Sequence, residues 1–195
     1  METVAVAHRA GNGLFALRQA EAAGAQLIEV DVHLFHSRLE ARHLKTVGPL
    51  RLYWDRWEVR PPSTPIVAFE DLLASTNHPL LIDLKGGAGS LGGRAAEAVE
   101  GRVGTTWICS RRWGHLEPLR GLPGLAVVAS VGSASQLARL LRRYGPGDLD
   151  GVSIATRRST RRRKFGAKPL PHRNIARSLR SPTGRPAALI RAKAR

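Results

Sequence analysis

The chain has 195 residues, a formal net charge of +16 and a single cysteine. One cysteine excludes an internal disulfide framework and is typical of a reducing compartment, so we expect a cytoplasmic protein. No segment approaches the ~20 apolar residues of a membrane span, and no signal peptide is predicted after Met1. The length suits one buried core, although a complete eight-stranded β/α barrel usually needs about 250 residues.

The positive charge is concentrated at the end of the chain. Residues 157–195 contain 14 Lys or Arg and no Asp or Glu, whereas the rest of the chain carries 17 basic and 15 acidic residues. A nearly neutral body does not favour nucleic acid as a partner. We therefore predict one domain over residues 1–155 and a basic, disordered tail over residues 156–195.

Apolar runs and helical periodicity alternate along the body. Seven strands are predicted, over residues 4–8, 27–34, 39–43, 80–85, 105–109, 125–131 and 151–154. Helical segments are predicted over residues 14–23, 69–75, 91–100, 115–120 and 133–144. Residues 44–78 contain mainly a long irregular loop. This alternation predicts an α/β fold with parallel strands, a TIM-type (β/α) barrel that is incomplete because no eighth strand is recognisable.

Two acids stand at i and i+2 in the second predicted strand. Because side chains alternate along a strand, Glu29 and Asp31 point to one face, and Val30 and Val32 to the other. Two buried carboxylates on one face repel each other unless a cation neutralises them. Taken alone, the pair fits either a Mg²⁺ or Ca²⁺ site or an exposed edge strand with two solvated acids.

Polar residues at other strand ends favour the metal site. In a β/α barrel the carboxyl ends of the strands gather at one face, where chemistry takes place. The candidates at or near those ends are His8, Arg9, Glu29, Asp31, His43, Asp83 and Lys85. A purely structural chain has little reason to repeat such residues on four strands.

This combination resembles the glycerophosphodiester phosphodiesterase family from about residue 4 to residue 154. The resemblance rests on His8-Arg9 after a first strand, Glu29-x-Asp31 in the second, His43 closing the third and Asp83-Leu84-Lys85 on the fourth. Residues 7–12, 30–34 and 42–46 are most similar to actinobacterial members. The family pattern departs here at Ala10, at His36-Ser37, at Asp83 in place of Glu, and throughout the chain after Ala155.

The resemblance implies a TIM barrel that hydrolyses glycerophosphodiesters to glycerol 3-phosphate and an alcohol. It implies His8 and His43 as the acid–base pair, and Arg9 and Lys85 as the phosphate-binding residues. It further implies a divalent metal, Mg²⁺ or Ca²⁺, held by Glu29, Asp31 and Asp83. The substrate is then a small molecule, with no specific nucleic-acid partner.

Two alternatives remain open. The chain keeps the ligands but is an impaired remnant, because an incomplete barrel leaves strand edges unpaired. Alternatively the basic tail binds nucleic acid or anionic membrane, which would make binding strongly salt-dependent. Other polar residues are assigned structural or solvated roles, namely His33, His36, His78, His115, Asp55, Glu58, Glu70 and Asp71.

Overall fold

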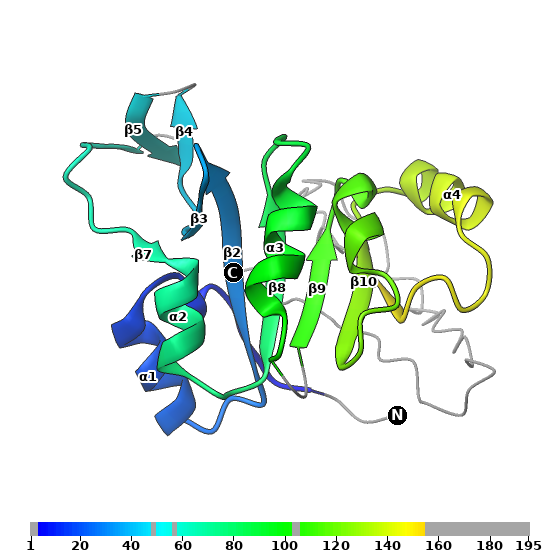
Figure 1. Ribbon diagram of the computed structural model, residues 1–195, viewed down its shortest axis with the longest axis horizontal. Helices are drawn as coiled ribbons and strands as arrows, with labels where there is room; N and C mark the ends of the chain where they lie inside the picture. Colours follow the sequence, from blue (N-terminus) through cyan, green and yellow to red (C-terminus); the bar gives the residue numbers. More distant parts are fainter. Residues whose placement is uncertain (1–3, 48–49, 56–57, 103–105, 155–195) are drawn as a thin grey trace, which may run out of the picture.

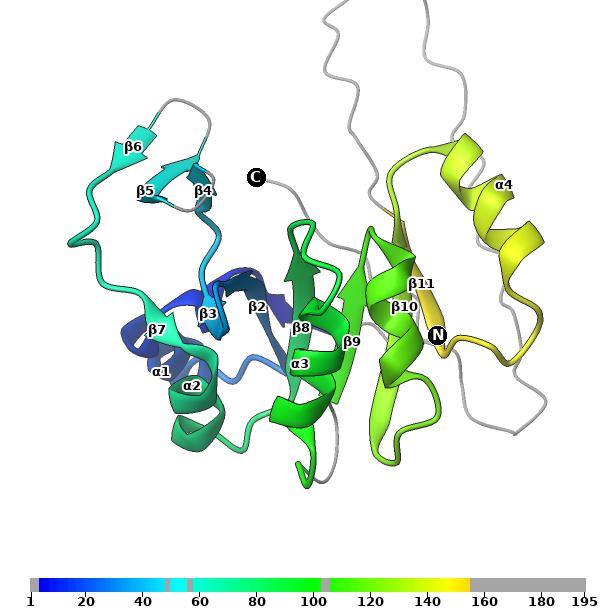
Figure 2. The same cartoon turned by 45° about the horizontal axis from the view of Figure 1, so that its top comes forward.

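The central feature of the computed structural model is one mixed sheet, drawn in Figures 1 and 2. The structure describes residues 4–47, 50–55, 58–102 and 106–154, so the predicted basic tail lies outside the described residues. The strands of this sheet follow the order β11-β10-β9-β8-β2-β3-β7, and β1 also pairs with β2. Their bounds are β1 Val6–Ala7, β2 Leu27–Phe35, β3 Arg38–Ala41, β7 Val67–Ala68, β8 Leu80–Lys85, β9 Thr106–Ser110, β10 Leu125–Val131 and β11 Gly151–Ile154.

Strand β2 is the longest element of the sheet and contacts three others. Strand β8 pairs with it in parallel along one edge. The other edge is divided: β1 pairs in parallel with the first two residues, and β3 pairs antiparallel with the last four. The side chains of β2 are nevertheless buried on both faces, including those of the two acids.

The parallel direction predicted for the third strand is wrong. Strand β3 forms an antiparallel hairpin with β2, and His43 lies beyond its end. Only two residues, His36 and Ser37, separate these strands, and a parallel connection needs a crossover of about a dozen residues. His36 takes φ 53° in this turn.

The predicted irregular loop contains more regular structure than expected. Three short strands form a separate antiparallel sheet in the order β4-β5-β6, which we call the small sheet. Its strands are β4 Lys45–Val47, β5 Leu50–Asp55 and β6 Glu58–Arg60. Figure 2 shows the small sheet beyond the end of β3, away from the helices that cover the main sheet.

Helices and one 3₁₀ helix bury the apolar side chains of one face of the main sheet. They are α1 Leu14–Ala22, α2 Phe69–Ser75, α3 Leu91–Val99, the 3₁₀ helix Trp113–Leu119 and α4 Ala134–Arg143. Ile28, Val30 and Val32 of β2 join this core. Each fully buried side chain of this size contributes roughly 1.5–3 kcal/mol. Ser133 is the N-cap of α4, since its Oγ accepts a hydrogen bond from the Gln136 backbone N–H.

The opposite face of the sheet carries a much smaller apolar cluster. Its buried members are Leu27, Leu81, Cys109 and Val128. Cys109 is buried and unpaired, and burial raises the pKa of its thiol, as expected for an unreactive core cysteine. Because Glu29 and Asp31 alternate with the core residues of β2, they lie on this second face.

Within the described residues the sheet is open. Strands β1, β2, β8, β9, β10 and β11 run parallel, and β1 and β11 do not pair with each other. The α/β class and parallel pairing are therefore confirmed, whereas a closed barrel is not formed by these strands. Among the same residues no helix is long and apolar enough to cross a membrane.

Substitution of two adjacent glycines of α3 by alanine should change the free energy of unfolding in opposite directions. A Cβ added at Gly92 would overlap the backbone of His115, whereas one at Gly93 meets nothing within 4 Å. We expect Gly92→Ala to lower the free energy of unfolding by about 1–3 kcal/mol through overpacking. Gly93→Ala should raise it by about 0.5–1 kcal/mol through helix propensity. Urea unfolding of both variants measures the two changes, and equal effects would contradict this packing.

Candidate active site

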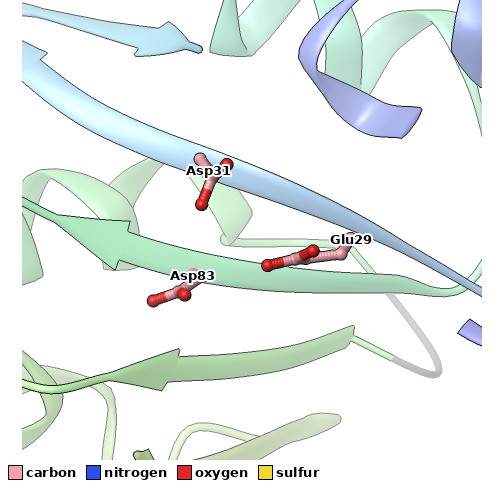
Figure 3. Close-up of side chains that lie close together, drawn as sticks. All are labelled: Glu29, Asp31 and Asp83. Carbon is pink, nitrogen blue, oxygen red and sulfur yellow. The ribbon is translucent and has the colours of Figure 1, made fainter. Parts of the chain in front are cut away.

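Three carboxylates converge on the second face of the main sheet. Asp31 of β2 lies opposite Asp83 of β8 in the parallel register, and Glu29 precedes Asp31 by two residues on the same face. One oxygen from each carboxylate lies within 4.8 Å of the others. Figure 3 shows Glu29 and Asp31 projecting from β2 and Asp83 from β8. The strand register thus brings together all three acids that the sequence predicts as metal ligands.

The three acids differ in their electrostatic environment. Burial, reinforced by the charges of Asp31 and Asp83, raises the pKa of Glu29 to about 7. Burial also raises the pKa of Asp83, against the opposing charge of Lys85. Burial acts in the same direction on Asp31, but the hydrogen bond with His43 and the charge of Lys85 outweigh it and hold this pKa well below its usual range. Asp31 is therefore charged at neutral pH.

His8 and Arg9 reach the acids from the end of β1. Nε2 of His8 lies 3.0 Å from Oε2 of Glu29, and the backbone N–H of Arg9 donates to the same oxygen at 3.1 Å. Arg9 takes a left-handed backbone with φ 61°, uncommon for a residue with a side chain. Its Nε lies 3.9 Å from Oδ2 of Asp31. Burial and the charge of Arg9 lower the pKa of His8.

His43 joins the cluster from the segment after β3. Its Nδ1 lies 2.9 Å from Oδ2 of Asp31, and its Nε2 lies 3.5 Å from Oδ2 of Asp55 on β5. Because the Asp31 carboxylate can only accept, Nδ1 of His43 is the donor in this hydrogen bond. Asp55, predicted to be solvated, is 30% exposed, and its carboxylate also faces this imidazole.

Lys85 lies among the acids. Its Nζ donates a hydrogen bond to Asp83 and lies 3.1 Å from Oδ1 of Asp31. Burial would lower the pKa of Lys85, but the charges of Asp83 and Asp31 outweigh it and raise this pKa. The ammonium therefore neutralises part of the negative charge that β2 and β8 bring together.

Asn12 is a site residue that the sequence analysis missed. Its Nδ2 donates to Oδ2 of Asp31 at 3.0 Å, and its Oδ1 accepts the backbone N–H of Asp31 at 2.8 Å. Asn12 lies in the 3₁₀ turn Ala10–Asn12, which follows β1. Gly11 allows this turn to approach β2, because a Cβ there would lie 2.7 Å from Cβ of Val30. The position of Asn12 just after His8-Arg9 was the feature of the sequence that could have identified it as a site residue.

His33 lies on the same face of β2 as Asp31, two residues further along the strand. It is 9% exposed, and burial together with the charge of Arg42 lowers its pKa to about 3. Its Nε2 has no hydrogen-bond partner among the described residues. His78 and His115 have structural contacts, with the Ala25 carbonyl oxygen and Ser110 Oγ respectively.

The donor set fits a hard divalent cation. Mg²⁺ and Ca²⁺ prefer carboxylate oxygens, and three acids offer them here at close range. Oδ1 of Asp83 is buried and has no hydrogen-bond partner among the described residues, so it is available as a ligand. A bound cation would also offset the charges of Asp31 and Asp83, which add to burial in raising the pKa of Glu29.

Comparison with solved structures identifies proteins that have a similar fold. The fold is similar to a structure from Silicibacter pomeroyi described as a glycerophosphoryl diester phosphodiesterase, with 15% identity, a TM-score of 0.52, and coverage of 69% of this chain and 66% of that one. The glycerophosphodiester phosphodiesterase from Thermotoga maritima gives 15% identity, a TM-score of 0.57, and coverage of 79% and 74%. The chain shares its fold with these phosphodiesterases.

A third structure extends the likeness. A protein from Agrobacterium tumefaciens, described as a glycerophosphoryl diester phosphodiesterase, gives 14% identity, a TM-score of 0.56, and coverage of 79% of this chain and 76% of that one. The chain thus spans about two thirds to three quarters of these structures. No family model and no curated protein matches the sequence.

The raised pKa of Glu29 predicts a stabilising substitution. In the metal-free protein, folding favours the protonated carboxyl, so the contribution of Glu29 to stability falls as pH rises from about 4.5 through about 7. Glu29→Gln removes this penalty and should raise the free energy of unfolding by about 1–3 kcal/mol at pH 8 in EDTA, with little effect at pH 5. Urea unfolding at both pH values measures the difference. Glu97→Gln on exposed α3 is the control, and an equal effect of Glu29→Gln at pH 5 and at pH 8 would contradict the prediction.

Proposed function

We propose that this chain hydrolyses glycerophosphodiesters to glycerol 3-phosphate and an alcohol, as a member of the glycerophosphodiester phosphodiesterase family. The observation that carries the proposal is the cluster of Glu29, Asp31 and Asp83. In this cluster the His8 imidazole contacts Glu29, and the His43 imidazole contacts Asp31. The sheet that carries it has the fold of the phosphodiesterases named above. This arrangement combines charge neutralisation with proton transfer, which phosphodiester hydrolysis requires.

Substrate binding is assigned to the cationic side chains. A phosphodiester is an anion, and Arg9 and Lys85 provide two positive charges beside the carboxylate cluster. The Arg9 guanidinium can bind two phosphate oxygens at once, whereas the Lys85 ammonium acts as a point charge. In this role they favour the extra negative charge that develops on phosphate oxygens during attack.

Glu29, Asp31 and Asp83 would hold a divalent cation, Mg²⁺ or Ca²⁺. When bound, such a cation supplies Lewis-acid polarisation of a phosphoryl oxygen. Asn12 holds Asp31 in place through its two hydrogen bonds, and the backbone N–H of Arg9 does the same for Glu29. Such supporting contacts orient carboxylate ligands.

His8 and His43 would carry out the two proton transfers. One imidazole accepts a proton from the attacking water as the water oxygen bonds to phosphorus. The other donates a proton to the alcohol oxygen as its bond to phosphorus breaks. Histidine suits both tasks because its ordinary pKa lies near neutrality. The contacts with Glu29 and Asp31 fix where each ring lies relative to the acids.

Substitution of the cluster tests the proposed reaction. Asp31→Asn and His8→Ala should each lower kcat/KM for glycerophosphocholine by at least about 10²-fold, because a ligand or a proton-transfer group is lost. Release of choline, measured by a coupled assay with Mg²⁺ or Ca²⁺, follows the reaction. Glu97→Gln is the matched surface control and should retain wild-type activity. Unchanged turnover in Asp31→Asn would refute the proposed site.

Metal binding has a separate readout. Adding Mg²⁺ or Ca²⁺ to the EDTA-treated wild type should raise its Tm, since a ligand that binds only the folded state stabilises it. At a cation concentration of 100 times Kd the gain is about 2.7 kcal/mol. Asp83→Asn should lose most of this shift, and Glu97→Gln should keep it. An equal shift in Asp83→Asn would exclude this acid as a ligand.

A further inference from the structure

The face of the main sheet that carries the acids continues from β8 across β9, β10 and β11 (Figure 2). In the parallel register Asp83 lies opposite Cys109, and Cys109 lies opposite Val128. Two residues further along each strand, side chains return to this face. The residues there are all polar, namely Lys85 of β8, Arg111 directly after β9, Ser130 of β10 and Ser153 of β11. This polar row leads away from the carboxylates along the carboxyl ends of the strands.

The backbone on both sides of Arg111 is fixed by the Ser110 hydroxyl. This buried hydroxyl donates a hydrogen bond to the Leu84 carbonyl oxygen at 3.0 Å and accepts the backbone N–H of Arg112 at 3.1 Å. The two hydrogen bonds join the bend after β9 to β8, at the residue before Lys85. The side chain of Arg111 is itself exposed. The fold therefore defines where Arg111 leaves the sheet, while its guanidinium stays accessible.

The charge of Arg111 acts on the site without forming an ion pair there. Burial raises the pKa of Asp83, and the charges of Lys85 and Arg111 oppose that rise. Lys85 contacts both Asp83 and Asp31, whereas the Arg111 guanidinium has no carboxylate within ion-pair distance among the described residues. Within that part of the chain, the hydrogen-bond donors of Arg111 are therefore available to an anion bound beside the site.

The two arms of a glycerophosphodiester differ in the charge that they can carry. The glycerol arm is neutral, whereas the alcohol arm varies among substrates and can be anionic. With the phosphate at Arg9 and Lys85, an arm directed along the polar row passes Arg111 and then the hydroxyls of Ser130 and Ser153. A guanidinium binds a carboxylate or phosphate through two parallel hydrogen bonds, and serine hydroxyls donate and accept hydrogen bonds. The row thus matches an alcohol that bears an anionic group.

We propose that Arg111 is a specificity residue that binds a negatively charged group on the alcohol arm, so that the chain prefers glycerophosphodiesters of anionic alcohols. Ser130 and Ser153 offer their hydroxyls along the same arm. This inference rests on the proposed function for its kinetic consequence. Binding measured under slow turnover tests the anion site separately.

The kinetic test compares two substrates that differ by one carboxylate. Glycerophosphoserine is glycerophosphoethanolamine with a carboxylate on the alcohol arm, so the two share the glycerol arm, the phosphate and the ammonium. We expect kcat/KM for the serine compound to be roughly 10–100-fold higher, which corresponds to one hydrogen-bonded contact with a charged group. Arg111→Gln should bring the ratio of the two kcat/KM values close to 1.

Arg139→Gln is the matched control for this ratio. It removes the same charge from an exposed position of α4, a helix that covers the opposite face of the sheet, and it should keep the wild-type ratio. If Arg111 only offsets the charge of Asp83, Arg111→Gln lowers kcat/KM for both substrates by the same factor. That result, or a wild-type ratio near 1, would overturn the specificity role and leave the proposed hydrolysis intact.

The binding measurement does not depend on turnover. Calorimetry on His8→Ala with Ca²⁺ compares the same two compounds, because this variant is expected to hydrolyse them slowly. Glycerophosphoserine should bind roughly 10–100-fold more tightly, and adding Arg111→Gln should make the two affinities equal. If the wild type hydrolyses neither compound but this preference is present, the proposed function fails and the anion site stands. Equal affinities in His8→Ala, or no binding of either compound, would overturn the anion site.

Discussion

Mutual repulsion among Glu29, Asp31 and Asp83 is the constraint on which the rest of the site depends. The register of β2 against β8 places three carboxylates on one face, where water is largely excluded. Burial of like charges is unfavourable unless opposite charges or hydrogen bonds compensate. The surrounding groups do so: Lys85 contacts two of the acids, and an imidazole lies against each of two. Burial, reinforced by the charges of Asp31 and Asp83, still raises the pKa of Glu29.

The division of one edge of β2 explains how the compensating groups reach the acids. Because β1 pairs only with the start of β2, the chain turns after Ala7 and brings His8, Arg9 and Asn12 over Glu29 and Asp31. Because β3 pairs only with the end of β2, the chain returns antiparallel and delivers His43 to Asp31. Core packing on the opposite face holds β2 in place, so stability and site geometry depend on the same strand.

Alternation and periodicity in the sequence were sufficient to predict most strands, the helices and the shared face of Glu29 and Asp31. They could not predict the direction of β3, because an apolar run carries no sign of whether its partner is parallel. Asn12 and Asp55 were missed for a related reason. Asn12 resembles any turn residue, and Asp55 belongs to a segment whose contact with His43 depends on how a separate sheet docks. Tertiary placement, rather than local pattern, decides such contacts.

The open sheet does not prevent the site from forming. His8, Arg9, Asn12, Glu29, Asp31, His43, Asp83 and Lys85 all come from β1, β2, β8 or the segments that directly follow β1 and β3. These strands pair with one another through β2. Strands β9 and β10 contribute Cys109 and Val128 to the apolar cluster on the same face. The carboxylates and imidazoles are therefore assembled by neighbouring strands on one side of the sheet, and pairing between β1 and β11 is not what brings them together.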